Sequence, residues 1–251
     1  MSRGERKQSM IMNRFRKLVI TVVYCMLQAY AFTEESISVS IGDTDLAIPN
    51  PSGFEPVTDE MTQFSEILTH FLSPTNDRLA FFISEEDAVI ARTGEFPDVF
   101  RRFDVQTPKN LAGATISPRQ FGTMKRLVIS QHESIFDRLE NQAKEELLKR
   151  ISEALAAEDT PDLAFPEFDL LPLPPHHESE QLVALSIIHS SEISDGDEVV
   201  TSLAKVLTLT LLYLEGKVLF LYVHGEPSSL EWTREESRKW AEEIISLNPQ
   251  P

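Results

Sequence analysis

The feature that most constrains the fold is a pair of apolar segments near the end of the chain, residues 203–213 and 218–224. They are separated by a short turn that contains Gly216, a residue that suits the positive-φ position of a tight hairpin. Because both faces of each segment are apolar, the sequence predicts two central antiparallel strands, with helices covering at least one face. The charges of Glu215 and Lys217 favour this hairpin over a membrane span at residues 204–224.

The remaining patterns predict an α+β fold. Serines alternate with Ile37, Val39 and Ile41, so residues 35–41 should form a half-buried strand that returns at 46–48. Further strands are expected at 79–83, at 100–107, where the pattern indicates a more exposed strand, and at 182–189. The predicted class is an antiparallel sheet with a C-terminal β-hairpin covered by helices, in a two-layer or α/β/α sandwich.

Helices are expected in three places. Residues 58–72 carry one apolar face at helical spacing. A second pattern starts at Ser117-Pro118, a strong helix start, and continues to about residue 157 as one helix or two. The last helix is predicted at 233–247, with Thr233 and Glu236 as a capping box and Asn248-Pro249 as its end.

Five prolines punctuate residues 158–177, which we interpret as a surface loop. This loop could also link two domains, but the second would be small. A single domain over residues 32–251 is therefore the prediction.

The N-terminus has the pattern of a secretory signal peptide at residues 1–31. Basic residues precede an apolar run at 18–27, and Ala29 and Ala31 supply the small residues of a cleavage site. A start at Met12 would fit this pattern better, and retention as a membrane anchor is the alternative. Cys25 follows Tyr24 and not a small residue, which argues against a lipoprotein. We expect export to the periplasm or the extracellular space.

Composition excludes several classes of function. The chain has 23 basic and 40 acidic residues and one cysteine, and that cysteine lies in the predicted signal segment. A cysteine-free mature chain has no disulfide, zinc-thiolate site or cysteine nucleophile. The net charge of −17 makes nucleic acid and anionic lipid poor partners. No catalytic serine motif or phosphate-binding glycine loop occurs, so neither catalytic nor cofactor-binding residues are assigned, and no cofactor is expected.

Two groups of residues are candidate metal ligands. His176, His177, Glu178 and Glu180 are close in sequence, but they follow two prolines and lack helical metal-binding spacing. His189 and His224 lie on predicted strands and could meet across a sheet. An exposed polar loop and hydrogen-bonded strand histidines are the simpler interpretations, so no metal site is assigned.

The segment LTLTLLYLEGKVLFLYVHGE, followed by LEWTREESRKWAEEIISLNP, resembles the ending of exported bacterial proteins of unknown function. The order of elements is also similar to the PsbP-like α+β sandwich. This resemblance implies a role in binding or assembly, and it carries no catalytic motif to this chain.

These observations favour a non-catalytic binding or accessory module of the bacterial cell envelope. Its partner would be a protein or a small molecule. The alternative is a metal-dependent periplasmic hydrolase that uses the histidines named above.

Overall fold

The computed structural model describes residues 35–70, 72–132, 134, 163–195 and 198–249. Contacts separate Met1–Glu35 from Ser36–Pro251, and the sheet and its helices belong to the second unit. The predicted signal peptide with Ala29 and Ala31 lies outside the described residues. So do residues 135–157, and with them the choice between one helix and two.

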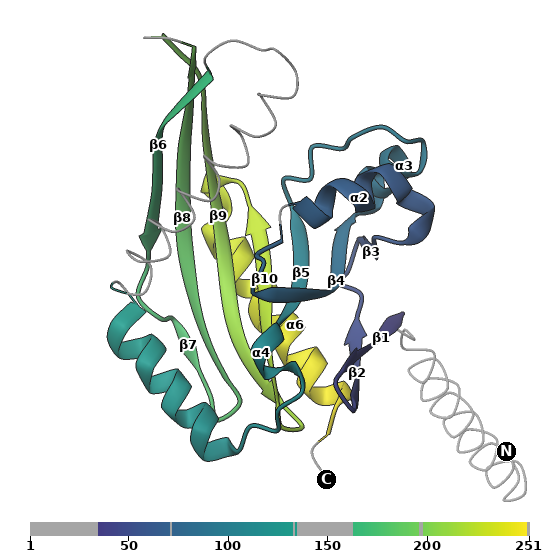
Figure 1. Ribbon diagram of the computed structural model, residues 1–251, viewed down its shortest axis with the longest axis vertical. Helices are drawn as coiled ribbons and strands as arrows, with labels where there is room; N and C mark the ends of the chain where they lie inside the picture. The colour runs from purple at the N-terminus through teal and green to yellow at the C-terminus, as the bar shows by residue number, and fades with distance from the viewer. Residues whose placement is uncertain (1–34, 71, 133, 135–162, 196–197, 250–251) are drawn as a thin grey trace, which may run out of the picture. The chain divides into compact units, whose positions relative to one another are not determined.

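The core of this unit is an antiparallel sheet that confirms the predicted α+β class (Figure 1). Its strand order is β3-β4-β5-β10-β9-β8-β6, and β7 pairs with β8 off this path. The strands are β3 (Phe54–Pro56), β4 (Asn76–Ser84), β5 (Arg102–Pro108), β6 (Leu163–Pro172), β7 (His177–Glu178), β8 (Leu182–Asp195), β9 (Glu198–Leu214) and β10 (Lys217–Gly225). A separate hairpin is formed by β1 (Ser36–Ile41) and β2 (Thr44–Pro49), as predicted.

The C-terminal β-hairpin is also confirmed. Lys217 pairs with Leu214, and the turn between them places Glu215 and Gly216 at φ 47° and 80°. A Cβ on Gly216 would lie 2.8 Å from the Thr115 side chain. Glycine is therefore required here for both its conformation and its size.

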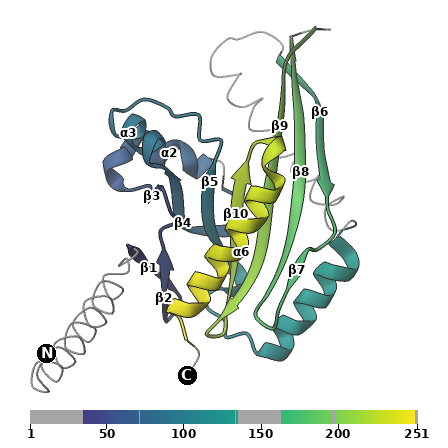
Figure 2. The same cartoon turned by 180° about the vertical axis from the view of Figure 1, so that it is seen from behind.

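One face of the sheet is covered by α6 (Leu230–Leu247) and the β1–β2 hairpin, and we call it the α6 face (Figure 2). Trp240 is buried at its centre, edge-on to Phe82 and Phe103, and donates from Nε1 to the Pro49 carbonyl at 2.9 Å. Trp240 therefore belongs to the core that joins α6 to the sheet.

The predicted capping box at Thr233 is wrong. The helix begins at Leu230, directly after the short 3-10 helix η2 (Pro227–Ser229). Thr233 lies inside α6, where its hydroxyl donates to the Leu230 carbonyl and accepts from Thr208 on β9. A buried strand hydroxyl needs a partner, and Thr233 supplies it.

Asn248 ends α6, as predicted, and also ties it to β2. Its side-chain oxygen accepts from the Ala47 N–H at 2.9 Å, and its amide donates to the Ala47 and Ile244 carbonyls at 2.8 and 2.7 Å. The side-chain amide therefore pairs with the edge of β2 as a peptide group of a neighbouring strand would.

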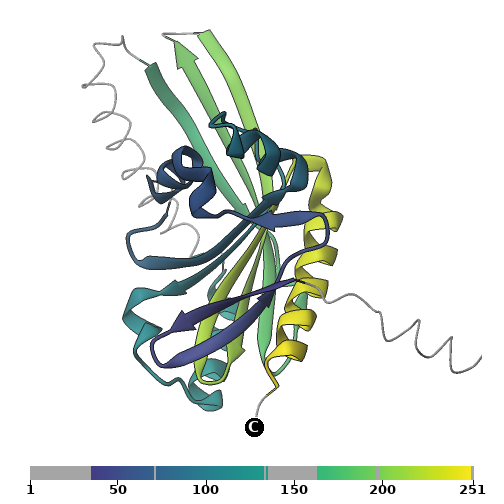
Figure 3. The ribbon, with the colours of Figure 1, turned by 90° about the vertical axis from the view of Figure 1, so that its right-hand side faces the viewer.

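The opposite face, which we call the second face, is covered by helices at its two sides. Near β4 lie α2 (Thr62–His70) and α3 (Glu85–Arg92), and over β8 and β9 lies the helix at 118–132. Figure 3 shows that last helix and α6 on opposite sides of the twisted strands. Two short helices, η1 (Asp59–Met61) and α4 (Lys109–Ala112), complete the described elements.

The predicted helix start at Ser117 is confirmed. The Ser117 hydroxyl accepts from the Gln120 N–H at 3.3 Å, and the Gln120 side chain accepts from the Ser117 N–H at 2.8 Å. This reciprocal pair satisfies two donors at the start of the helix.

Two predictions are corrected by the sheet. Residues 163–172 form strand β6 and not part of a proline-rich loop at 158–177. β6 lies at the edge of the sheet, and its pairing with β8 is irregular between Ala164 and Glu167, around Pro166. Edge positions and irregular pairing tolerate the missing proline N–H. The strand predicted at 100–107 as more exposed is β5, which is mostly buried between β4 and β10.

Candidate functional site

Polar side chains gather on the second face where β5 and β10 meet. Along β5, Arg102, Asp104 and Gln106 alternate with residues that are buried on the α6 face. They pair with His224, Tyr222 and Phe220 of β10, in that order. Paired residues of antiparallel strands point to the same face, so these six side chains form two adjacent rows.

Asp104 is the centre of a hydrogen-bonded network and is only 4% exposed. It accepts from Gln106 Nε2 at 2.7 Å and from Arg78 Nε at 3.4 Å. The Gln106 side-chain oxygen accepts from Asn76 at 2.9 Å. Burial raises the pKa of Asp104, and the charge of Arg78 and the Gln106 hydrogen bond act against this rise.

An irregularity in β4 brings Arg78 into this network. The register shifts between Arg78, which pairs with Gln106, and Ala80, which pairs with Val105. A bulge changes the alternation of side chains, so Arg78 and Phe81 share the second face. The guanidinium carbon of Arg78 lies 5.0 Å from the centre of the Phe81 ring.

Arg102 and Lys205 are two half-buried cations beside this network. Arg102 donates from Nη1 to the carbonyl of Val99 at 3.1 Å, and Val99 has a φ of 38°, which is uncommon for a β-branched residue. Burial lowers the pKa of Arg102 to about 10, and burial followed by the charge of Arg102 lowers that of Lys205. Within the described residues, neither cation forms a direct ion pair. Asp104 is paired with Arg78, and its charge offsets part of the burial of Arg102.

The two strand histidines lie on the same face as these cations. His224 pairs with Leu207 on β9, two residues from Lys205, and Lys205 pairs with His189 on β8. Burial and then the charge of Arg102 hold the pKa of His224 well below its usual value, and burial and Lys205 lower that of His189. We call these five groups of the second face the basic strip: Arg78, Arg102, His189, Lys205 and His224.

The basic strip does not have the chemistry of a cation site. Arg78 and Arg102 both act on the single carboxylate of Asp104, and Lys205 adds a third permanent positive charge beside Arg102. This excess of positive charge repels a divalent metal. Across the described ranges, no group of three or more His, Cys, Asp or Glu side chains is placed to hold a metal ion.

The other candidate cluster is divided between the two faces. His177 pairs with Ala184, and His176 lies near Arg234 of α6. Burial, followed by the charge of Arg234, lowers the pKa of His176 to about 4. Glu178 instead accepts from Lys125 at 3.2 Å, in the helix that covers the second face, and Glu180 is exposed. The structure therefore separates residues that are adjacent in sequence.

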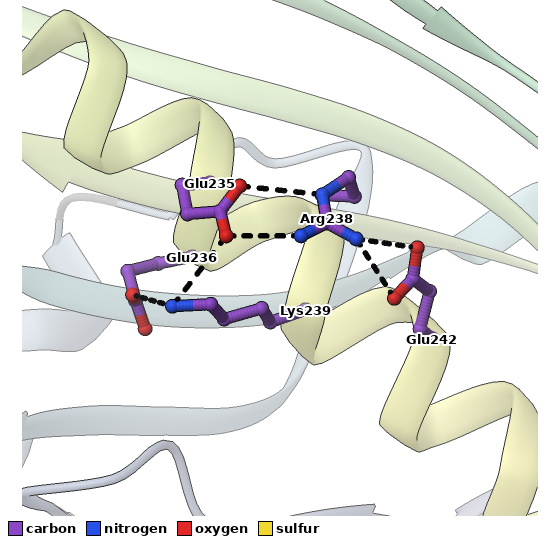
Figure 4. A network of polar contacts seen from close by, with 5 residues as sticks. All are labelled: Glu235, Glu236, Arg238, Lys239 and Glu242. Atoms are coloured by element: carbon purple, nitrogen blue, oxygen red, sulfur yellow. Dashed lines mark hydrogen bonds and ion pairs between the residues drawn. The ribbon is translucent and has the colours of Figure 1, made fainter.

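Charges elsewhere are arranged differently, as the outer surface of α6 illustrates (Figure 4). Arg238 binds Glu235 and Glu242, and Lys239 contacts Glu236 at 3.1 Å. These pairs are at least partly exposed, and such pairs contribute little to stability. Against this background, two half-buried cations that form no direct ion pair in the described part of the chain are the unusual feature.

Sequence reasoning missed most of the basic strip. The alternation of Arg102, Asp104 and Gln106 with apolar residues is visible in FRRFDVQT, but that pattern also fits the solvent side of an exposed strand. The bulge that orients Arg78 leaves no sequence signal. Of the strip, the sequence singles out His189 and His224 alone.

No family model matches the chain, and no curated protein matches it. Among solved structures, it is similar to the solution structure of cyanobacterial PsbP (CyanoP) from Synechocystis sp. PCC 6803, with 10% identity and a TM-score of 0.31. The match covers 87% of this chain and 94% of that one. No helix among the described residues is long and apolar enough to cross a membrane.

Proposed function

We propose that the chain is an exported, non-catalytic binding module of the bacterial cell envelope, and that its basic strip binds an anionic ligand. The observation that carries this proposal is the pair of half-buried cations, Arg102 and Lys205, that form no direct ion pair within the described residues; the charge of Asp104 offsets only part of the burial of Arg102. Burying an unpaired charge is unfavourable, and a bound anion would remove that penalty.

The surroundings of the two cations support this choice of ligand. The chain carries a net charge of −17, so composition alone does not account for a local excess of positive charge. The Tyr222 phenol lies in the adjacent row, and burial raises its pKa, which keeps its hydroxyl protonated and able to donate. His224 would gain a proton more readily beside an anion than beside cations.

Binding is favoured over catalysis by the state of the titratable groups. Asp104 is held by Arg78 and Gln106, so it is poorly placed to accept a proton from a substrate. The low pKa of His224 makes it a weak base. The predicted signal peptide supports export.

The proposal is tested by thermal shift and calorimetry at low ionic strength, with inorganic phosphate and acetate as first probes. An anion at about a hundredfold its Kd should stabilise the protein by about 2.7 kcal/mol. The variants Arg102→Gln and Lys205→Gln should each lose most of this stabilisation. Arg238→Gln, which removes a paired cation on α6, is the matched control and should bind normally.

Two results would refute the proposal. One is the absence of binding to every anion tested, including larger carboxylates. The other is equal binding by Arg102→Gln, Lys205→Gln and the unaltered protein, because the anion would then bind elsewhere.

A further inference from the structure

The basic strip borders an apolar surface on the same face of the sheet. Leu207, Leu209, Phe220 and Tyr222 are each half-buried on β9 and β10, and we call them the apolar row. Leu209 pairs with Tyr222, and Leu207 pairs with His224 of the basic strip. The two surfaces are therefore continuous along the hairpin.

The polarity of this surface changes from one end to the other. From His224 through Tyr222 to Phe220, the side chains of β10 span about 13 Å at the usual rise of a strand. The first of them adjoins Arg102 and Leu207, and the last adjoins Gln106 and Leu211. On the β8 side, Leu207 and Leu209 of the apolar row pack against Leu185 and Ile187, which are buried and also contact Val128.

We infer that the ligand is an amphiphilic carboxylate, with its carboxylate at Arg102 and Lys205 and its aliphatic chain along the apolar row. This inference rests on the proposed function and specifies its ligand. A compact anion would use only the cationic end and would leave unused the part of the apolar row that the described residues do not cover. An aliphatic chain covers them, because removing apolar surface from water is favourable in proportion to its area.

The ring arrangement of β10 fits a chain lying flat against the sheet. Phe220 and Tyr222 meet edge to face with centres 6.4 Å apart, and the Tyr222 and His224 rings have centres 6.3 Å apart and planes inclined by 29°. The rings thus form one connected surface from the cationic end to the apolar end.

The inference is tested with acetate, hexanoate and decanoate, measured by calorimetry below the concentration at which decanoate forms micelles. Affinity should rise about two- to fourfold for each methylene covered, and one ligand should bind per chain. Decylammonium has a similar aliphatic chain but the opposite charge, so it should not bind. This series uses the unaltered protein and does not depend on the folding of any variant.

Two variants separate the two ends of the site. Arg102→Gln should weaken every carboxylate by a similar factor. Phe220→Ser should weaken decanoate at least tenfold and leave acetate nearly unchanged, with circular dichroism as a check on its folding.

The outcomes distinguish the inference from the proposed function. If acetate, phosphate and decanoate bind equally, the amphiphile inference is overturned while the proposed anion site stands. Binding of decylammonium as tightly as decanoate also overturns the inference, because the head group would then play no part. If no anion binds, both fail.

Discussion

Replacement of Asn248 by alanine should destabilise the protein by much more than a typical surface change. The substitution removes three hydrogen bonds, two of them to the backbone of Ala47 and one to the Ile244 carbonyl. Each contributes about 1 kcal/mol, and the Ile244 carbonyl keeps a bond to the backbone N–H of residue 248. The expected loss in the free energy of unfolding is therefore about 2–3 kcal/mol.

The loss can be measured by urea denaturation followed through tryptophan fluorescence, with the dependence on urea unchanged. Hydrogen exchange at the Ala47 N–H should also accelerate, which would locate the effect at the edge of β2. Asn110→Ala, on the exposed surface of α4, is the matched control and should change stability by less than about 0.5 kcal/mol. A loss below about 1 kcal/mol for Asn248→Ala would refute the view that this side chain holds α6 to the hairpin.

Three further predictions concern buried or strained positions. Lys217→Met should lower the free energy of unfolding, measured by urea titration, by about 1–3 kcal/mol, because the Lys217 side chain is 2% exposed and donates to two backbone carbonyls. Loss of the exposed partner Asp43 should lower it far less. His224 should make the free energy of unfolding fall as the pH drops from about 7 to 5, because its lowered pKa means that the unfolded chain binds a proton that the folded chain does not. His224→Gln should reduce this pH dependence by up to about 1.4 kcal/mol per pH unit. Gly216→Ala should lower the melting temperature through its positive φ, while Gly113→Ala, with open space around it, should not.

Each of these predictions has a contradicting result. For the buried lysine, it is a methionine variant as stable as the original chain. For His224, it is a pH dependence that the substitution leaves unaltered. For the hairpin turn, it is equal melting of the two glycine variants.

The parts of the fold that follow local patterns could be predicted from the sequence. Alternation identified β1, and the doubly apolar segments identified the β9–β10 hairpin. The helix start at Ser117 was visible because Ser117 and Pro118 are adjacent in sequence, and the structure adds Gln120 as the partner of Ser117.

The predictions failed where distant segments decide the structure. Thr233 has the residue type of a helix cap, but Thr208 recruits it into the interior. The prolines of β6 predict a loop, but β6 is an edge strand, where proline is tolerated. The basic strip depends on the register of five strands and on a bulge beside Arg78, and neither is encoded by a nearby motif.

The packing of the first hairpin against the last helix sets an order of events for a growing chain. Val39 and Ile48 share a core with Trp240 and Ile244, so nearly the whole described chain separates the two partners. Contacts between such distant residues form late, because a long loop must close first. The hairpin therefore cannot complete its burial until the C-terminal helix has been made. This part of the core therefore stays incomplete until the last helix of the chain has been synthesised, and it should be among the last regions to gain protection from hydrogen exchange during refolding.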